Sequence, residues 1–365
     1  MNDGHLMRAA LALARRGLGT VWPNPTVGCV LVKDGVVVGR GWTQPGGRPH
    51  GETEALARAG ARAKGATAYV SLEPCCHHGK TPPCTNALIA AGIAHAVVPI
   101  EDPDPRVAGR GIAKLREAGI TVDLGLCAEE AAAINAGFLS RLKTGRPLVT
   151  VKLATTLDGK IATARGESRW ITGELARERA HLLRATHDAV MVGVGTVVAD
   201  DPLLTCRLPG LEMRHPVRIV VDGSLRTPLT AKLIADAQQI PTWIIHRPGV
   251  DTARLEAMRG CGVEPIETPV TRSDELDLGA ALIELGKRGL TRILVEGGAK
   301  LVGALLESDL VDRLAWFQAP LLLGGDGYPA VEAFGVATLA TAPRFKRLAL
   351  EQLGADMLEI LTRAA

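Results

Sequence analysis

A twelve-residue segment rich in potential metal ligands constrains the fold of this chain more than any other feature. Residues 73–84 read EPCCHHGKTPPC and contain three cysteines and two histidines. A tetrahedral ion takes four ligands, so at least one of these five side chains has another role. If two of them bind a metal together with a residue from elsewhere, the fold must bring that distant segment to this loop.

The third ligand is expected upstream, in the segment PHGETEAL at residues 49–56. His50 should begin a helix there, and Glu52 follows two positions later. Cys75 comes at the end of a strand pattern, and Cys84 opens a helix, whose terminal amides favour a thiolate. Three protein ligands leave the fourth position to water, as in a catalytic zinc site. Zinc lowers the pKa of that water, and Glu52 can shuttle its proton.

The remaining ligand types in the segment have plainer interpretations. Cys76 would need a different backbone path to join the same ion as Cys75, so we interpret it as a small filler. His77 and His78 are more often surface or hydrogen-bonding residues. A closed, structural site that uses one of these histidines as a fourth ligand stays an alternative.

The order H-x-E, then P-C, then a second cysteine is the signature of zinc-dependent nucleobase deaminases, in which the catalytic Glu is not a ligand. In most of these deaminases two residues separate the two cysteines. Here eight residues, CHHGKTPP, lie between Cys75 and Cys84.

Composition limits the class of protein and the partners. The chain has 365 residues, of which 47% are hydrophobic and 22% charged, which suits a soluble α/β protein of two domains. Its net charge is only +3 and 3% of its residues are aromatic, which disfavours nucleic acid as a partner. The net charge does not exclude small phosphorylated substrates.

The location is expected to be the cytoplasm. No apolar run is long enough to cross a membrane, and the first residues indicate an amphipathic helix rather than a signal peptide. The seven cysteines are odd in number and irregularly spaced, which favours metal binding over disulfides. The oligomeric state is open, with a homo-oligomer among the alternatives.

Strand and helix patterns alternate along the chain, which predicts an α/β fold. The run TVGCVLVKDGVVVGRGWT reads as a hairpin that turns at Asp34-Gly35. The alternation breaks at Gly145 and Pro147, between a helix and the strand pattern LVTVKLATT. We therefore expect two domains, residues 1–145 and 146–365, and they share no visible repeat.

Four segments of the first half closely resemble the deaminase part of the bifunctional riboflavin-biosynthesis deaminase–reductases: PNPTVGCVLV, PHGETEAL, LEPCCHHGKTPPC and DPDPRVAGRG. The long insert between the cysteines is typical of that family. KLATTLDGKIAT, GESRWIT, LLRATHDAVMVGVGTVVADDPLLTCR and VEGGAKLVGALL resemble its reductase part. The resemblance covers nearly the whole chain, with both modules in the family's order.

The resemblance implies a fold and two activities. It implies a cytidine-deaminase-like three-layer domain followed by a dihydrofolate-reductase-like α/β domain. The first step is zinc-dependent hydrolytic deamination of 2,5-diamino-6-ribosylamino-4(3H)-pyrimidinone 5′-phosphate, and the second is NADPH-dependent reduction of its ribosyl group to ribityl. One Zn²⁺ per chain and NADPH are the implied cofactors.

The resemblance also implies the roles of particular residues. Asn24 should hold the pyrimidine, Lys80 should meet the substrate phosphate, and Asp102 and Asp104 should line the same pocket. The implied NADPH contacts are Ala154, Trp170, Thr196, Asp200, Gly223, Gly298, Ala299, Lys300, Leu301, Val302, Gly303 and Ala304. The implied substrate contacts in the reductase are Ser168, Arg184, Leu204, Arg207 and Glu296.

The chain departs from the family pattern at four positions near the deaminase motifs. Gly51 stands where Ala is frequent, Cys76 where Ser is common, and Thr43 where several members have His. Asp104 replaces an Asn found in many members. The acid removes an amide donor and adds negative charge to the implied pocket.

In the second half, RILVEGGAKLVGALLE predicts a strand, a Gly297-Gly298 turn and a helix. Such a turn lets the backbone approach a phosphate at a helix N-terminus, although a simple tight turn is the commoner case. Arg184 and Arg207 suit phosphate or ribose, whereas each alone would more often be a solvated charge. Lys152 and Asp158 are candidates for acid–base chemistry, and Asp158 has the alternative role of shaping a turn.

Two rival functions remain at this point. The first is a deaminase of nucleic-acid bases with an RNA-binding appendage, which the near-neutral charge and few aromatic residues disfavour. The second is a non-catalytic protein with a structural zinc, which Glu52 and the open fourth position disfavour.

Overall fold

A computed structural model of the chain describes residues 2–364. It divides into two compact units, with the division between Gly145 and Arg146. The first unit contains α1 (Asp3–Arg15), β1 (Gly28–Lys33), β2 (Val36–Trp42), η1 (Pro45–Gly47), α2 (Gly51–Ala59), η2 (Gly60–Ala63), β3 (Thr67–Val70), α3 (Cys84–Ala90), β4 (His95–Val98), α4 (Arg110–Glu117), β5 (Thr121–Leu124), α5 (Ala128–Ile134) and α6 (Ala136–Thr144).

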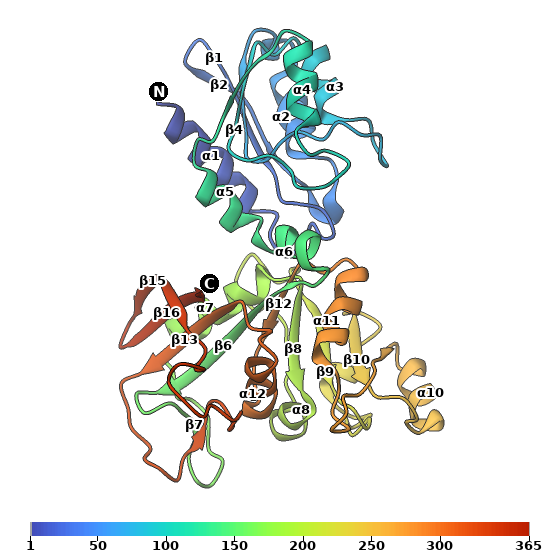
Figure 1. Ribbon diagram of the computed structural model, residues 1–365, viewed down its shortest axis with the longest axis vertical. Coiled ribbons are helices and arrows are strands. Elements are labelled where there is room, and N and C mark those ends of the chain that lie inside the picture. Colours follow the sequence, from blue (N-terminus) through green and yellow to red (C-terminus); the bar gives the residue numbers. More distant parts are fainter. Residues whose placement is uncertain (1, 365) are drawn as a thin grey trace. The chain divides into compact units, whose positions relative to one another are not determined.

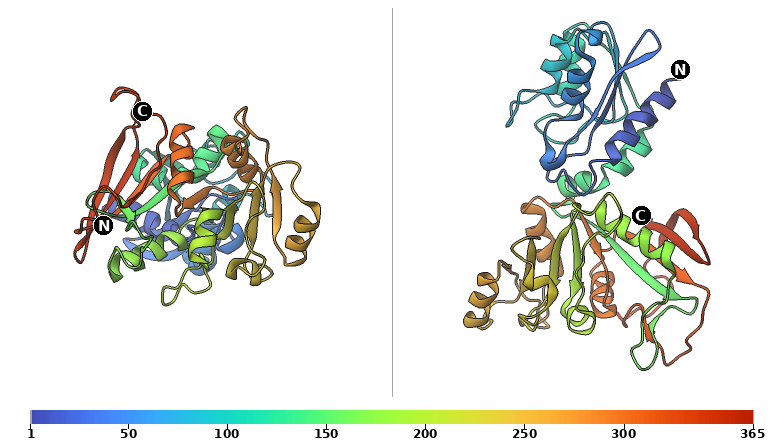
Figure 2. Two further views of the ribbon diagram at one scale, coloured as in Figure 1. Left: turned by 90° about the horizontal axis from the view of Figure 1, so that it is seen from below. Right: turned by 180° about the vertical axis from the view of Figure 1, so that it is seen from behind.

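The first unit is a three-layer α/β/α structure (Figures 1 and 2). Its described strands form one sheet in the order β2-β1-β3-β4-β5, antiparallel at the β2 end and parallel from β3 to β5. The expected hairpin joins β1 to β2, and both Asp34 and Gly35 have positive φ there. A turn with two positive φ angles matches the twist of the flanking strands.

Alternate strand residues fill two cores, one on each face of the sheet. Helices α1 and α5 cover Val30, Val32 and Tyr69, whereas α2, α3 and α4 cover the face with Leu31 and Val70. The second face matters for function because α2 and α3 both begin at the same end of it, where their first residues meet the loop after β3.

The second unit contains β6 (Leu148–Thr156), β7 (Lys160–Ala162), α7 (Glu174–Ala185), β8 (Ala189–Gly193), α8 (Val194–Asp200), β9 (Val217–Val221), α9 (Lys232–Ala235), β10 (Thr242–His246), α10 (Thr252–Gly260), β11 (Glu264–Glu267), α11 (Leu278–Lys287), β12 (Arg292–Val295), α12 (Ala299–Glu307), β13 (Arg313–Ala319), β14 (Tyr328–Pro329), β15 (Phe345–Leu353) and β16 (Asp356–Arg363).

A large sheet organises the second unit. Within the described residues its order is β11-β10-β9-β8-β12-β6-β13-β16-β15, parallel as far as β13 and antiparallel beyond it. β7 pairs separately with β14. In parallel sheets ligands bind beyond the carboxyl ends of the strands. That edge carries the turns after β8, β9 and β12, where many of the expected cofactor residues lie.

No helix in the described part of the chain combines the length and apolar character needed to cross a membrane.

Candidate active sites

The three expected zinc ligands lie together in the first unit. His50 is the N-cap of α2, Cys84 is the first residue of α3, and Cys75 lies in the loop after β3. The Nδ1 atom of His50 is 3.2 Å from the Sγ of Cys84 and 3.7 Å from the Sγ of Cys75. Possible ligand atoms of all three residues lie within 4.8 Å of one another. This is a donor set that one tetrahedral ion can use.

Close packing at the start of α2 fixes the position of His50. A Cβ atom on Gly51 would lie 2.5 Å from the backbone oxygen of Val27, at the edge of β1. The absence of a side chain therefore lets α2 begin directly against the sheet. A hydrogen bond positions Cys84: its backbone N–H donates to the Sγ of Cys75 at 3.3 Å.

Glu52 lies beside the ligand cluster and is almost completely buried, at 2% exposure. Among residues 2–364 its Oε2 atom has no hydrogen-bond partner. Burial raises the pKa of this carboxyl to about 7, although His50 acts in the opposite direction. A buried carboxyl near neutrality, with one oxygen unsatisfied, fits a residue that exchanges a proton with a bound water.

Electrostatics favour a thiolate in the cluster. Hydrogen bonds from the thiol of Cys84 and from His50 lower the pKa of Cys75 to about 4, against the opposing effect of burial. A thiolate is the form in which cysteine binds zinc. Together with the unsatisfied oxygen of Glu52, the chemistry of this donor set fits a zinc ion.

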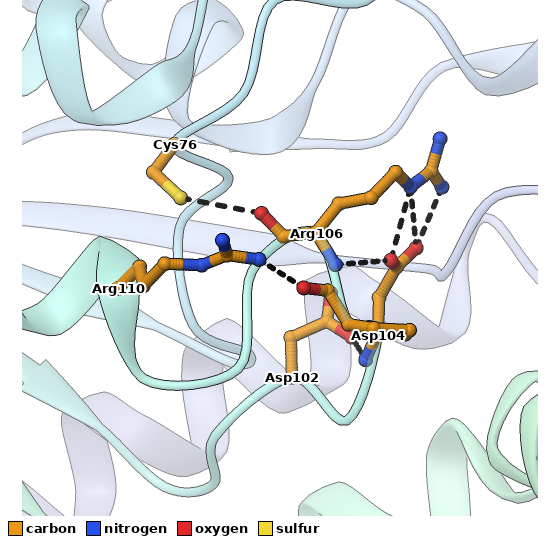
Figure 3. Close-up of polar contacts among 6 residues, drawn as sticks. Cys76, Asp102, Asp104, Arg106 and Arg110 are labelled. Carbon is orange, nitrogen blue, oxygen red and sulfur yellow. Dashed lines mark hydrogen bonds and ion pairs between the residues drawn. The ribbon is translucent and has the colours of Figure 1, made fainter.

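The neighbouring ligand types of the segment do not join the cluster. The Sγ of Cys76 points to the backbone oxygen of Arg106 at 3.6 Å (Figure 3). His78 is exposed, and His77 is half-buried with its Nδ1 unpartnered among the described residues. The group of possible ligands found in residues 2–364 consists of His50, Cys75 and Cys84.

The residues expected to bind the pyrimidine come from separate loops. Asn24 is half-buried against Gly47, where a Cβ atom would lie 1.7 Å from its Nδ2. Lys80 is exposed on the insert between the cysteines. Asp102 is buried, and burial raises its pKa to about 6, with Cys75 among the neighbours that act on it. Asp104 donates its backbone N–H to the Oδ1 of Asp102 at 2.9 Å.

Glu73 is a site-building residue that the sequence reasoning missed. Its buried carboxylate accepts four backbone N–H groups: those of Asp102 and Gly109 on Oε2, at 3.0 Å each, and those of Gly111 and Ile112 on Oε1, at 2.8 and 3.1 Å. It therefore fixes the loop from residue 101 to α4. The sequence signal was an acid two residues before the first Cys ligand, which resembles an ordinary surface charge.

A cleft of about 1180 Å³ lies at the carboxyl edge of the large sheet in the second unit. Most of the expected reductase residues line it. These are Ala154, Ser168, Trp170, Arg184, Thr196, Asp200, Leu204, Arg207, Gly223, Glu296, Gly298, Ala299, Lys300, Leu301 and Ala304.

Two of the expected cofactor residues are not among those that line the cleft. Val302 is completely buried, and a Cβ atom on Gly303 would lie 3.1 Å from the backbone oxygen of Glu332. Both lie on parts of the α12 surface that pack against the protein. The helix period therefore separates them from Leu301 and Ala304.

The turn before α12 has the geometry expected of a phosphate-binding turn. Gly297 has a φ of 96°, which favours glycine, and the backbone N–H of Gly298 donates to the Oγ1 of Thr196 at 3.1 Å. Thr196 comes from α8, after the adjacent strand β8. A Cβ atom on Gly298 would meet only this Oγ1, at 3.5 Å, which leaves the turn open for a ligand.

A buried ion pair between Arg184 and Glu296 also lines the cleft. Arg184 donates to Glu296 through Nε at 2.5 Å and Nη2 at 2.8 Å. Burial alone would raise the pKa of Glu296, but Arg184 and Lys152 outweigh it and hold this pKa at about 2. Burial lowers the pKa of Lys152, which lines the cleft.

Asp158 has the turn-shaping role that the sequence left as an alternative. Its carboxylate accepts from the Oγ1 of Thr156 at 2.5 Å and from the backbone of Gly324 at 2.7 Å. It therefore fastens the turn between β6 and β7 to the segment before β14, and it is not among the residues that line the cleft.

Comparisons with known proteins assign both units. Residues 1–100 match the cytidine and deoxycytidylate deaminase zinc-binding region, and residues 147–358 match the RibD C-terminal domain. The riboflavin biosynthesis protein RibD of Escherichia coli K12 is 44% identical over 98% of both chains. The chain belongs to the RibD family.

Solved RibD structures agree with this assignment. RibD of Acinetobacter baumannii superposes with a TM-score of 0.89 at 39% identity, over 100% of this chain and 99% of that one. The Thermotoga maritima diaminohydroxyphosphoribosylaminopyrimidine deaminase/5-amino-6-(5-phosphoribosylamino)uracil reductase gives 0.85 at 33% identity, over 99% and 98%.

The comparisons confirm the family, the fold class and the two activities predicted from the sequence. As a RibD protein, the chain is a deaminase and reductase of riboflavin biosynthesis. Its first unit has a zinc-binding deaminase fold, and its second is a reductase domain of the NADPH-using type. The substrate is a small pyrimidine compound.

Proposed function

We propose that His50, Cys75 and Cys84 hold one zinc ion per chain and that Glu52 is the acid–base residue of the deamination. The observation that carries this proposal is the convergence of three ligand atoms within 4.8 Å beside a buried carboxyl oxygen that has no partner in residues 2–364. When bound, zinc activates a water for attack on the pyrimidine carbon that bears the amine.

Glu52 moves the proton in this scheme. Its Oε2 is available to accept a proton from the attacking water, and a pKa of about 7 lets it release that proton to the leaving ammonia. Asn24, Asp102 and Asp104 orient the pyrimidine, and Lys80 meets the phosphate. The substrate is thus the phosphorylated pyrimidine 2,5-diamino-6-ribosylamino-4(3H)-pyrimidinone 5′-phosphate.

The cleft of the second unit holds NADPH and the deaminated product. Thr196 fixes the turn by accepting the backbone N–H of Gly298, and the remaining backbone N–H groups at the start of α12 support the cofactor phosphates. Arg184 is held in place by Glu296 and by the backbone oxygen of Thr205, to which its Nη1 donates at 2.9 Å, and it lines the cleft as a substrate contact. Lys152 is our candidate to supply a proton from Nζ, because it lines the cleft and burial lowers its pKa.

We assign the two activities to residues 1–145 and 146–365, respectively. The cytoplasmic location also stays a prediction.

Ammonia release from the pyrimidine substrate, measured with and without a chelator, tests the proposal. We expect the chelator to stop ammonia release and added zinc to restore it. Reduction of the deaminated intermediate with NADPH should proceed in both cases. Chelator-resistant deamination in protein shown to be metal-free would contradict the zinc assignment.

A further inference from the structure

The loop at residues 102–110 carries an acidic residue, Asp104, and the structure shows a cationic side chain that pairs with it. The backbone N–H of Arg106 donates to Asp104 Oδ1 at 2.9 Å. Its Nε lies 3.0 and 3.2 Å from the two carboxylate oxygens, and its Nη2 lies 2.6 Å from Oδ2. Figure 3 shows the two side chains facing each other in a two-pronged contact.

The ion pair keeps Asp104 ionised. The opposite charges of Asp104 and Arg106 cancel, so the pair as a whole is neutral. The guanidinium lowers the pKa of Asp104, so the side chain is a carboxylate that accepts hydrogen bonds and cannot donate as an amide would. Asp104 is 5% exposed, whereas the side chain of Arg106 is 68% exposed, so the carboxylate lies inward and its cationic partner faces solvent. Pro105 separates the partners and restricts the backbone between them.

The pair is linked to the surroundings of the zinc cluster through neighbouring residues. The backbone N–H of Asp104 donates to Asp102, and the backbone oxygen of Arg106 accepts from the thiol of Cys76, the residue after the expected ligand Cys75. A charge left on Asp104 would therefore lie close to the site at which an anionic substrate reacts.

We propose that Asp104 and Arg106 act as one neutral unit, and that Arg106 is a specificity-determining residue for the phosphorylated substrate of the deaminase. Arg106 makes Asp104 compatible with a phosphate-bearing substrate, which a lone buried carboxylate would repel. This inference rests on the deaminase site proposed above.

Steady-state deamination by Arg106→Gln, Asp104→Asn and the double variant tests the inference. We expect Arg106→Gln to raise KM at least about tenfold with little change in kcat, because repulsion weakens binding. Its KM should fall toward normal as salt rises, since salt screens the repulsion. Asp104→Asn and the double variant should have KM values within about threefold of each other, because a neutral residue at 104 no longer needs Arg106.

Arg110→Gln is the matched control. It removes a cation from the same loop, but Arg110 donates to the backbone oxygens of Pro105 and Val107 and not to Asp104, so KM should hardly change. Zinc content and melting temperature should be unaltered in all variants.

A normal KM in Arg106→Gln, or a double variant as impaired as that single one, would overturn the inference. If Arg106→Gln does not fold, the comparison of Asp104→Asn with the double variant decides, since unequal KM values would refute the neutral unit. Glu52→Gln, assayed in parallel, tests the deaminase assignment separately from the role of Arg106. If Glu52→Gln loses ammonia release, the deaminase assignment holds, whatever the variants at positions 104 and 106 show.

Discussion

At the scale of single residues, Cys76 and Cys84 show how backbone position decides the role of a thiol. Cys76 is the first residue of the insert and Cys84 follows its last, and both were possible ligands by type. Cys84 opens α3 and lies against His50, whereas Cys76 turns to the backbone of Arg106. The spacing motif predicted the same separation, because Cys76 would need a different backbone path to join the same ion as Cys75.

This difference leads to a prediction about metal content. Cys84→Ser should lose zinc, because it removes one of three protein ligands, and Cys76→Ser should retain one equivalent per chain. Metal analysis of the purified proteins is the measurement. The opposite pattern, with zinc lost from Cys76→Ser and kept in Cys84→Ser, would mean that the ligand set is wrong.

The roles of Glu73 and Arg106 could not be predicted from one sequence. Each depends on where a loop folds back: Glu73 collects backbone donors up to 39 residues away, and Arg106 reaches back to the residue two before it. Local patterns describe strands, helices and short motifs, but they do not specify which backbone groups a buried carboxylate will meet.

At the scale of elements, the sequence predicted the N-terminal helix α1, the helices α2 and α3 that begin at His50 and Cys84, and the β1–β2 hairpin, because each has a clear period, start or turn signal. The sequence did not separate the cleft-facing residues of α12 from those that pack inward, such as Val302 and Gly303. Both kinds lie in one apolar run, and the neighbouring chain decides which side is buried.

The turn before α12 provides a prediction on cofactor binding. Gly298→Val should raise the dissociation constant for NADPH strongly, because a side chain there obstructs the approach of a phosphate to the helix amides. The protein should still fold, since a Cβ atom at this position meets only Thr196, at 3.5 Å. Titration of cofactor fluorescence measures the effect, and unchanged ammonia release is the control. Unaltered NADPH affinity would show that the turn is purely structural.

Helix α7 is followed by a histidine that should make stability depend on pH. His187 is buried between the backbone oxygen of Leu183 and the Oγ1 of Thr150. Burial and the nearby Arg292 lower its pKa to about 3. The unfolded chain takes up the proton near pH 6.5 and the folded one does not, so stability should fall as pH drops from about 6.5 toward 3.

The change is expected to reach about 2 kcal/mol by pH 5 for this residue alone. His187→Gln can keep both hydrogen bonds and cannot titrate, so its unfolding free energy should decline less steeply between pH 7 and pH 5. Urea unfolding of both proteins across this range gives the two slopes. Identical slopes would exclude His187 as a source of the pH dependence.

At the scale of the whole molecule, the chain combines two chemistries in two compact units. The break in the sequence pattern at Gly145 and Pro147 lies at the division seen in the structure, between Gly145 and Arg146. Gly145 ends α6 with a φ of 77°, and Arg146 begins the second unit with an ion pair to Asp312. The identity of the reductase substrate contacts came from the family resemblance, because isolated arginines carry no specific signal.

We predict that a fragment of residues 146–365 binds NADPH and reduces the deaminated intermediate. It contains the whole cleft, from Lys152 to Glu332. Cofactor titration and a reduction assay on the folded fragment are the measurements, and NADH serves as the comparison ligand, with weaker binding expected. A folded fragment that fails to bind NADPH would show that cofactor binding needs the first unit.

The most direct test of the whole account is to measure both activities and the metal content of Glu52→Gln on one preparation. The amide keeps the size of the side chain and removes the group that carries the proton. The account predicts one zinc per chain, ammonia release reduced by at least about 100-fold, and normal NADPH-dependent reduction of the deaminated intermediate. Normal ammonia release from the folded, zinc-containing variant would contradict it.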